Sequence, residues 1–569
     1  MKYTFSEIPF SVPNFKEIKQ KFESIDQAIQ QASSKEEVLR NYDAYNDLVL
    51  EYSTLNSIAT IKFYGDLSNE EAKKVYLQFD ENNPILDPLS KSINRSLFNS
   101  PFKEALKEDL GQRFFELLEF EVKLYNPNIH AETARISQLC TQYEELASKA
   151  NYSIDDKNYN EMGLMVLKTS GDRSIRKKAM EASTSFFYSN KKEIGDIFSE
   201  LVKKRHEIAQ KSGLQNYHDY SFIYYGRTGY NKQDIEHFRN HVAKHFKPLQ
   251  ERLMEIRKEE LKLEQIKYYD LTVLFDSGSP RTYGSNEEKL NHAVEMYDKM
   301  SPQTGAVMRM MKEKELFDID NRPNKLGGGF MSPLSYYKVP YIFTSFGGSS
   351  FDYTVLTHEF GHAFQYTHSL QSKYMLMNGP SLDAVETFSM AMEIFAYPYV
   401  PMYFKQDSSK FYLDHLKANI GQIINMSFGD EFQQMVYENV DWTDEDRNNA
   451  YLAMQQKYTI PADKDHNAYL IEGNDWKSNS HFVTIPFYYI DYGFAISIAL
   501  QLYQIMKVDY QKALSIYIKL CENSAGLNLM KLIEITGLKS PFEEETIREL
   551  AEFLKGEVEL AYANFKATK

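Results

Sequence analysis

One short stretch of the sequence contains the residue types of a hydrolytic metal site. It reads His358-Glu359-Phe360-Gly361-His362, which matches the pattern H-E-x-x-H. On a helix, residues four apart lie one turn apart on the same face, so the two imidazoles can converge on one ion. Glu359 then projects beside them, where it can accept a proton from water. This arrangement is typical of zinc peptidases. The alternative is an ordinary helix with two unrelated histidines.

A third metal ligand is expected downstream, because catalytic zinc is usually held by three protein ligands and a water. Residues 381–393 have apolar side chains at helical spacing, which predicts a second helix. Glu386 lies on this helix, and we expect it to be the third ligand. Glu393 and Asp383 are candidates for carboxylates that orient the metal-bound imidazoles. The alternative is that these two are plain surface or capping residues.

Longer runs around these residues resemble a known family. HEFGHAF from His358, followed by PSLDAVETFSMAMEIF from Pro380, is similar to the M3 family of zinc metallopeptidases. The similarity is to the oligoendopeptidase F branch rather than to the branch of thimet oligopeptidase and neurolysin. Further matches to that branch are residues 205–220, 269–271, 327–330, 340–343, 481–482 and 486–488. The zinc-site segments are specific, whereas the N-terminal third carries no such motif.

The resemblance implies a hydrolytic mechanism. One Zn²⁺ per chain would be bound by His358, His362 and Glu386. A zinc-bound water, activated by Glu359 as general base, would attack the scissile carbonyl, and Glu359 would then pass the proton to the leaving amine.

The resemblance also implies a second group of catalytic residues in the segment 481–492. His481 would bind the substrate backbone. Tyr492 is the first choice for the donor that stabilises the oxyanion, with Tyr489 and Tyr488 one helical turn earlier as alternatives. A tyrosine common in the branch is replaced here by Ile490, so the roles of the individual tyrosines stay open. The alternative is an aromatic core.

The sequence before the motif predicts a small sheet. Residues 325–348 are rich in glycine, β-branched and aromatic residues, which indicates short strands and turns. We expect residues 341–346 to be an edge strand that pairs with an extended peptide, with Tyr341 and Phe343 as substrate-binding residues. Gly328 and Gly329 would let the backbone approach the substrate. The alternatives are ordinary sheet core and a tight turn.

The rest of the sequence predicts a mostly α-helical protein. Apolar residues recur at helical spacing in 14–55, 114–124, 242–266 and 544–564, and 492–505 reads as a buried core helix. The resemblance implies two helical halves around a deep cleft, with the small sheet beside the zinc helix, a zincin fold of the neurolysin type. We expect residues 1–195 to form an N-terminal helical region that supplies part of the cleft wall, and residues 196–569 to form the catalytic region.

The composition argues against several other classes of protein. The 569 residues carry a net charge of −15, which argues against a broad nucleic-acid-binding surface. The two cysteines are too few for a disulfide framework or a cysteine-based zinc site. The N-terminus lacks a secretory signal, and no stretch is long and apolar enough to span a bilayer. We therefore expect a cytoplasmic enzyme without nucleic-acid or membrane partners, acting on short unstructured peptides, including peptides that contain proline or glycine.

Two other functions stay open. A zinc carboxypeptidase of the M32 type also uses this motif with a downstream glutamate, but it needs a fixed cation for the substrate carboxylate. The segment 481–492 favours M3. A non-catalytic peptide-binding scaffold of the same fold is the second alternative, and the intact ligands and Glu359 argue against it. Cobalt or manganese could also occupy this ligand set.

Overall fold

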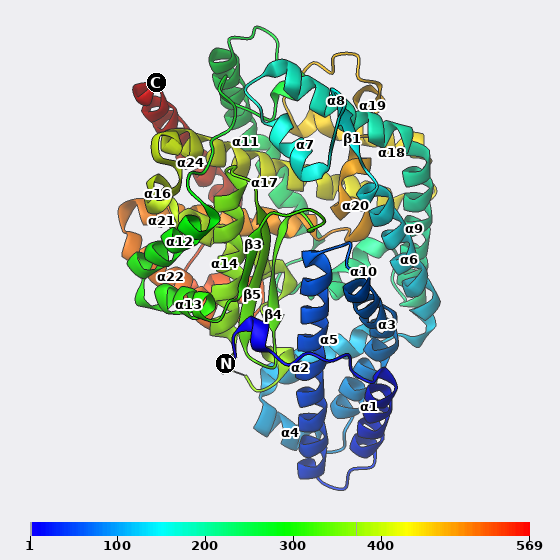
Figure 1. Cartoon of the computed structure of the whole chain (residues 1–569). Helices are drawn as coiled ribbons and strands as arrows, with labels where there is room; N and C mark the ends of the chain where they lie inside the picture. Colours follow the sequence, from blue (N-terminus) through cyan, green and yellow to red (C-terminus); the bar gives the residue numbers. More distant parts are fainter. Residues whose placement is uncertain (1–2, 371) are drawn as a thin grey trace.

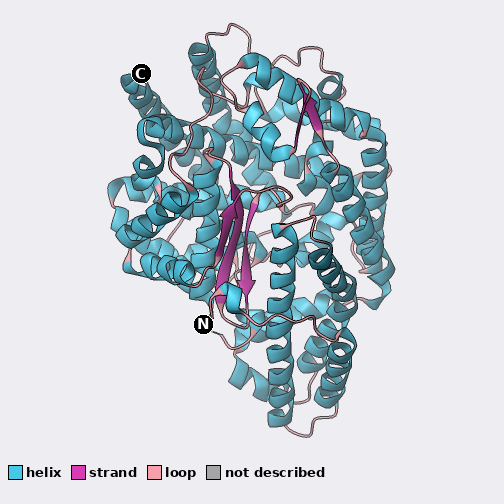
Figure 2. Ribbon diagram, viewed as in Figure 1, coloured by secondary structure: helices cyan, strands magenta, loops and turns pink. Residues whose placement is uncertain are grey.

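The computed structural model describes residues 3–370 and 372–569 and is mostly α-helical, as the sequence predicts (Figures 1 and 2). The first helices are α1 (Phe15–Gln30), α2 (Lys35–Gly65), α3 (Glu70–Phe98), α4 (Lys103–Leu110), α5 (Gln112–Leu124), α6 (His130–Ser148), α7 (Glu161–Lys168), α8 (Arg173–Ser189), α9 (Lys191–Lys211) and α10 (Tyr217–Tyr224). The middle helices are α11 (Lys232–Leu261), α12 (Asn286–Met300), α13 (Pro302–Glu313), α14 (Phe351–Ser369), α15 (Val385–Phe395), α16 (Val400–Phe404) and α17 (Ser408–Glu438). The last helices are α18 (Asp444–Tyr458), α19 (Ala468–Ile471), α20 (Ser480–Thr484), α21 (Tyr489–Val508), α22 (Tyr510–Glu522), α23 (Leu529–Thr536) and α24 (Glu544–Thr568). The strands are β1 (Tyr152–Ile154), β2 (Lys157–Tyr159), β3 (Phe317–Asp320), β4 (Gly329–Leu334) and β5 (Val339–Phe346).

The N-terminal helices form a unit with its own core. Figure 1 shows α1 and α4 at the bottom of the view, below the sheet, and α2 extending from there up beside β4. Buried side chains of α1 to α5, among them Tyr42, Leu97 and Phe114, form a cluster separate from the main core. Tyr374 and Leu376, which follow α14, pack onto this cluster. The chain that leaves the metal-motif helix therefore contacts the N-terminal unit before it enters α15.

A three-stranded sheet lies against α14 (Figure 2). Its order is β3-β5-β4, with β5 parallel to β3 and antiparallel to β4. β5 is thus the central strand, and all its residues are buried. The prediction of an edge strand at 341–346 is wrong, because β5 has a hydrogen-bonded neighbour on each side, β3 and β4. Tyr341 and Phe343 are core residues, 4% and 0% exposed.

The main core surrounds α15, α17 and α21. These helices pack against one another, and α14 packs against α15. α21 is buried from Ile490 to Tyr503, as predicted, except at Tyr492. That tyrosine is therefore the point at which this core helix meets the site. No helix among the described residues combines the length and the apolar character needed to cross a membrane.

Candidate active site

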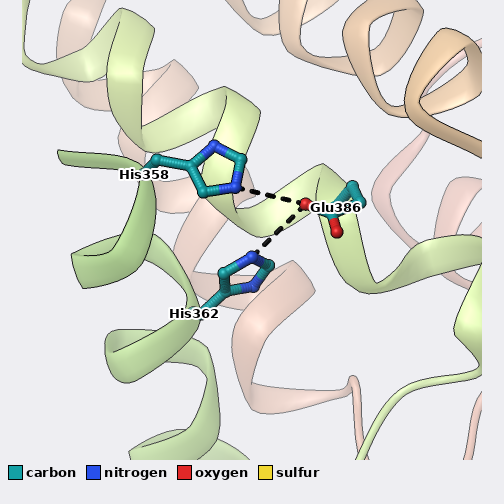
Figure 3. A group of neighbouring side chains, drawn as sticks. All are labelled: His358, His362 and Glu386. Atoms are coloured by element: carbon teal, nitrogen blue, oxygen red, sulfur yellow. Dashed lines mark ion pairs between the residues drawn. The ribbon is translucent and has the colours of Figure 1, made fainter. Parts of the chain in front are cut away.

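Two helices bring the three expected metal ligands together. His358 and His362 lie one turn apart on α14, and Glu386 lies in the first turn of α15. The Nε2 atoms of both histidines are 3.3 Å from Oε2 of Glu386 (Figure 3). The three side chains offer ligand atoms that all lie within 4.8 Å of one another. Two imidazole nitrogens and one carboxylate oxygen at this spacing fit the ligand set of catalytic zinc.

A glycine allows the two helices to approach closely enough. A Cβ atom at Gly361 would lie 2.5 Å from the carbonyl oxygen of Phe388 and 2.6 Å from Cα of Ser389. Both atoms belong to the backbone of α15, so neither can move aside as a side chain would. Gly361 therefore sets the distance between the helix that carries both histidines and the helix that carries Glu386.

Each oxygen of Glu386 has a hydroxyl partner. The Ser389 hydroxyl donates to Oε2 at 3.0 Å, and the Tyr488 hydroxyl donates to Oε1 at 2.9 Å. Burial alone would raise the pKa of Glu386. The charge of His362 and hydrogen bonds from both histidines outweigh burial and hold that pKa well below its usual value. Glu386 is therefore a carboxylate, the form that binds a cation.

Glu393 orients one of the imidazoles. Nδ1 of His358 donates to Glu393 at 2.7 Å, which leaves Nε2 free to bind a metal. The other oxygen of Glu393 accepts from Nε2 of His415 at 2.8 Å, and the Tyr397 hydroxyl donates to Nδ1 of His415 at 2.7 Å. Two further side chains, His415 and Tyr397, thus fix the position of Glu393 through hydrogen bonds.

Asp383 lies elsewhere. It accepts hydrogen bonds from the Tyr230 hydroxyl, at 2.9 Å, and from the Ser381 hydroxyl. The structure does not bring it to either imidazole, so it anchors the turn before α15. Burial raises its pKa.

Glu359 points into the site between the helix and the sheet. The residue is 6% exposed, and burial raises its pKa despite the nearby charges of His358 and His362. A backbone hydrogen bond from Met331 on β4 counteracts part of this rise. A carboxylate with a raised pKa accepts a proton more readily near neutral pH than an ordinary glutamate does.

Three tyrosines and a histidine of the site lie on α20, on α21 and at the residue directly before α21. Tyr488 reaches Glu386, and Tyr492 feels the charges of Glu386 and Glu359, which together with burial raise its pKa. The His481 ring lies 5.1 Å from the Tyr489 ring and 6.1 Å from the Tyr492 ring, and burial lowers its pKa.

Tyr489 differs from the other two tyrosines, because its hydroxyl is engaged by Asn479. The structure thus brings Tyr488 and Tyr492 close to Glu386, whereas the Tyr489 ring lies beside His481. A neutral His481 and these two phenols are the hydrogen-bonding groups on this side of the site.

Comparison with known proteins assigns the family. Residues 166–552 match the model described as peptidase family M3, and residues 5–125 match the model of the peptidase M3 N-terminal domain. The chain belongs to peptidase family M3. It is 22% identical to oligopeptidase PepF of Bacillus subtilis (strain 168) over 80% of this chain and 69% of the relative. It is also 22% identical to an oligoendopeptidase F homolog of Borreliella burgdorferi, over 94% and 93% of the two chains.

Solved structures agree with this assignment. The fold matches PZ peptidase A, crystallised with an inhibitor, with a TM-score of 0.92 and 34% identity over 98% of this chain and 99% of that one. The M3 family, its oligoendopeptidase F branch and the mostly helical fold, which the motifs predicted, are thereby confirmed.

Two glycines at the start of β4 in this M3 peptidase, Gly328 just before the strand and Gly329 as its first residue, have a packing reason. Gly328 has φ +89°, a left-handed conformation that favours glycine. A Cβ at Gly329 would lie 2.4 Å from a methyl group of Val355 on α14. These residues let β4 lie against the metal-motif helix, which explains their identity without a substrate.

Some residues of the site carried no signal in the sequence. His415 and Tyr397 lie 22 and 18 residues from their partners in the chain, without a motif to mark them. Gly361 lies inside the H-E-x-x-H pattern, at a position where that pattern accepts any residue. Only the close contact between α14 and α15 reveals why it is glycine.

Proposed function

We propose that this M3 peptidase is a zinc-dependent oligoendopeptidase that hydrolyses internal bonds of short peptides. The observation that carries the proposal is the group His358, His362 and Glu386, with Glu359 on one side and Tyr488 and Tyr492 on the other. A peptidase site needs a base for water and donors for the developing oxyanion, and both are grouped around the ligands.

Nε2 of His358, Nε2 of His362 and a carboxylate oxygen of Glu386 would hold the ion. When bound, zinc would lower the pKa of water toward ~7 and polarise the scissile carbonyl. Glu393 supports this assignment, because its bond to Nδ1 of His358 fixes the tautomer in which Nε2 carries a lone pair.

The remaining steps belong to side chains of this protein. Glu359 takes the proton from the attacking water and passes it to the leaving amine, in keeping with its raised pKa. Tyr492 is our first choice for donating to the oxyanion, with Tyr488, whose hydroxyl bonds to Glu386, and Tyr489 as the alternatives. A neutral His481 can donate a hydrogen bond to the substrate backbone.

β4, the edge strand beside β5, is the strand with which an extended peptide substrate would pair, a role first expected of β5. Alternate residues of a strand direct their backbone groups to the same side. The carbonyl of Pro333 faces away from β5, since it accepts from Ser57 of α2, and the backbone of Met331 faces Glu359. Gly329 and the carbonyl of Met331 therefore lie on the outer side of β4, where an extended peptide can pair with them. The N-terminal helices beside this edge would then enclose the peptide in a cleft and exclude folded proteins.

Peptides that contain proline or glycine are the substrates to test first. Both cysteines, Cys140 and Cys521, are free, which fits a reducing compartment, and we propose a cytoplasmic location.

A pair of peptides tests the endopeptidase proposal. One internally quenched peptide has both ends blocked, and its control has the same sequence with a free carboxyl end. We expect internal cleavage of both at similar kcat/KM. Cleavage of the free-ended peptide alone, with loss of single C-terminal residues, would instead identify a carboxypeptidase.

A further inference from the structure

The backbone between His481 and Tyr488 is held by buried side chains of α9, of α17 and of the loop between α10 and α11. This clamped segment is residues 484–488. Its bonds are Arg205 Nη2 to the Thr484 carbonyl at 3.1 Å, Tyr225 hydroxyl to the Pro486 carbonyl at 2.9 Å, Phe487 N–H to Gln433 Oε1 at 2.9 Å, and Arg227 Nη2 to the Phe487 carbonyl at 2.5 Å. Such a set of side-chain bonds fixes a loop that has no regular secondary structure of its own.

The backbone of the clamped segment is strained at Phe487. Its φ is +69°, a left-handed conformation that bulky residues seldom adopt. Its ring is completely buried and stacks on the His218 ring at 4.7 Å with an interplanar angle of 10°. Strained backbone of this kind persists where the surroundings over-determine it, and it concentrates at functional sites.

Among these side chains, Arg227 bonds both to the clamped segment and to the first turn of α21. Its Nη2 donates to the carbonyl of Phe487 and to Oδ1 of Asp491, the latter at 2.7 Å. Phe487 directly precedes Tyr488, and Asp491 directly precedes Tyr492. One guanidinium therefore ties together the residues that aim both phenols at the metal ligands.

This arrangement is poorly explained by stability alone. The side chains of Arg227 and Asp491 are both 0% exposed, so both charges have lost their water. Among the described residues, Nε and Nη1 of Arg227 and Oδ2 of Asp491 have no hydrogen-bond partner. A buried ion pair with unused donors and acceptors is seldom better for stability than apolar packing, whereas such pairs can fix one geometry.

We propose that Arg227 is a positioning residue for Tyr488 and Tyr492. It does not touch the substrate and acts by fixing the backbone on which the two phenols stand. The inference rests on the proposed peptidase mechanism, because it assigns these phenols to the reaction. A shift of about 1 Å in such groups can cost about 10²-fold in rate, so a looser clamp should lower kcat.

Arg239 offers a matched control. It is also buried, and it donates to Oδ2 of Asp430 and to Oε1 of Gln434, both at 2.6 Å. Among the described residues, no hydrogen bond joins Arg239 to the clamped segment. We expect Arg227→Lys to lower kcat about 10- to 100-fold with KM and zinc content nearly unchanged, and Arg239→Lys to leave kcat close to wild type. Equal effects of the two substitutions would overturn the inference.

A double-mutant cycle distinguishes positioning of the two phenols from a general loss of structure. If Arg227 acts through the phenols, Arg227→Lys should cost little in a Tyr488→Phe/Tyr492→Phe background, although it costs 10- to 100-fold in the wild type. The same factor in both backgrounds would contradict the inference.

Should Arg227→Lys fail to fold, Asp491→Asn weakens the same link while keeping an acceptor oxygen, and the same non-additivity is expected. A wild type that cleaves no peptide would refute the proposed function, whereas active wild type with additive effects refutes only the role of Arg227.

Discussion

At the scale of single residues, the ligands of the site are fixed by partners on their far sides. Glu386 accepts from Ser389 and Tyr488, and His358 donates to Glu393, which His415 also contacts. The ligands themselves could be predicted from spacing on two helices. The sequence also offers Glu393 as a carboxylate that orients an imidazole. Its further partner His415 could not be predicted, because contacts between separate helices leave no periodic pattern in the chain.

Glu393 should therefore matter for metal binding. Glu393→Gln keeps the volume but replaces a carboxylate by a neutral amide facing Nδ1 of His358, so we expect zinc affinity to fall about 10- to 100-fold. Asp383→Asn is the control, since Asp383 is buried nearby but contacts neither imidazole. Competition with a fluorescent zinc chelator measures both variants. Equal zinc affinities for the two would show that the contact to His358 does not tune the metal site.

At the scale of elements, the helices were more predictable than the sheet. Amphipathic periodicity indicated α11 and α24 and the apolar run indicated α21, because one face, or all faces, of each helix is buried. The hairpin β1–β2 and strand β3 were not predicted. β3 is four residues long with Asp318 and Asp320 in it, and it pairs in parallel with β5, which is more than twenty residues away. Because the pairing of β3 with β5 is non-local, the local sequence pattern does not indicate that β5 is the central strand.

The contact between α14 and α15 gives a prediction at this scale. Gly361→Ala would place a methyl group against the backbone of α15, so the helices must separate. We expect a loss of about 1–3 kcal/mol in the free energy of unfolding and weaker zinc binding, because Glu386 would move away from both histidines. Gly556→Ala on α24 is the control, as its Cβ would meet nothing within 4 Å. Urea denaturation and zinc titration check both variants, and unchanged zinc affinity in Gly361→Ala would contradict this account of the helix contact.

At the scale of the whole molecule, a buried carboxylate joins segments that lie far apart in the sequence. Asp270, in the segment 269–271 that resembles the family, is 0% exposed. It accepts hydrogen bonds from Arg173 and Arg176 of α8 and from the backbone of Lys267. Burial would raise the pKa of Asp270, but these bonds outweigh it and lower the pKa below its usual value. The resemblance marked this segment, but only the structure shows that its task is to hold α8.

The pH dependence of stability follows from this shift. Because the folded pKa of Asp270 is below the unfolded value of about 3.9, its contribution is complete above that value and disappears as the pH falls through the folded pKa. Asp270→Asn should therefore lower the free energy of unfolding by about 3–5 kcal/mol at pH 7, and the deficit should narrow below about pH 4. Urea denaturation at pH 7, 5 and 3.5 measures it, with Asp155→Asn, in an exposed pair with Lys178, as control. A deficit that does not change with pH would show that Asp270 does not act through its charge.

The central claim is that Glu359 is the base of a zinc peptidase. The most direct measurement is zinc content together with hydrolysis of an internally quenched, end-blocked peptide, for wild type and Glu359→Gln. We predict about one zinc per chain in both proteins and a loss of about 10³-fold or more in turnover for the variant. Loss of zinc from Glu359→Gln would make Glu359 a structural residue, and cleavage at the wild-type rate by a zinc-loaded variant would contradict its role as the base.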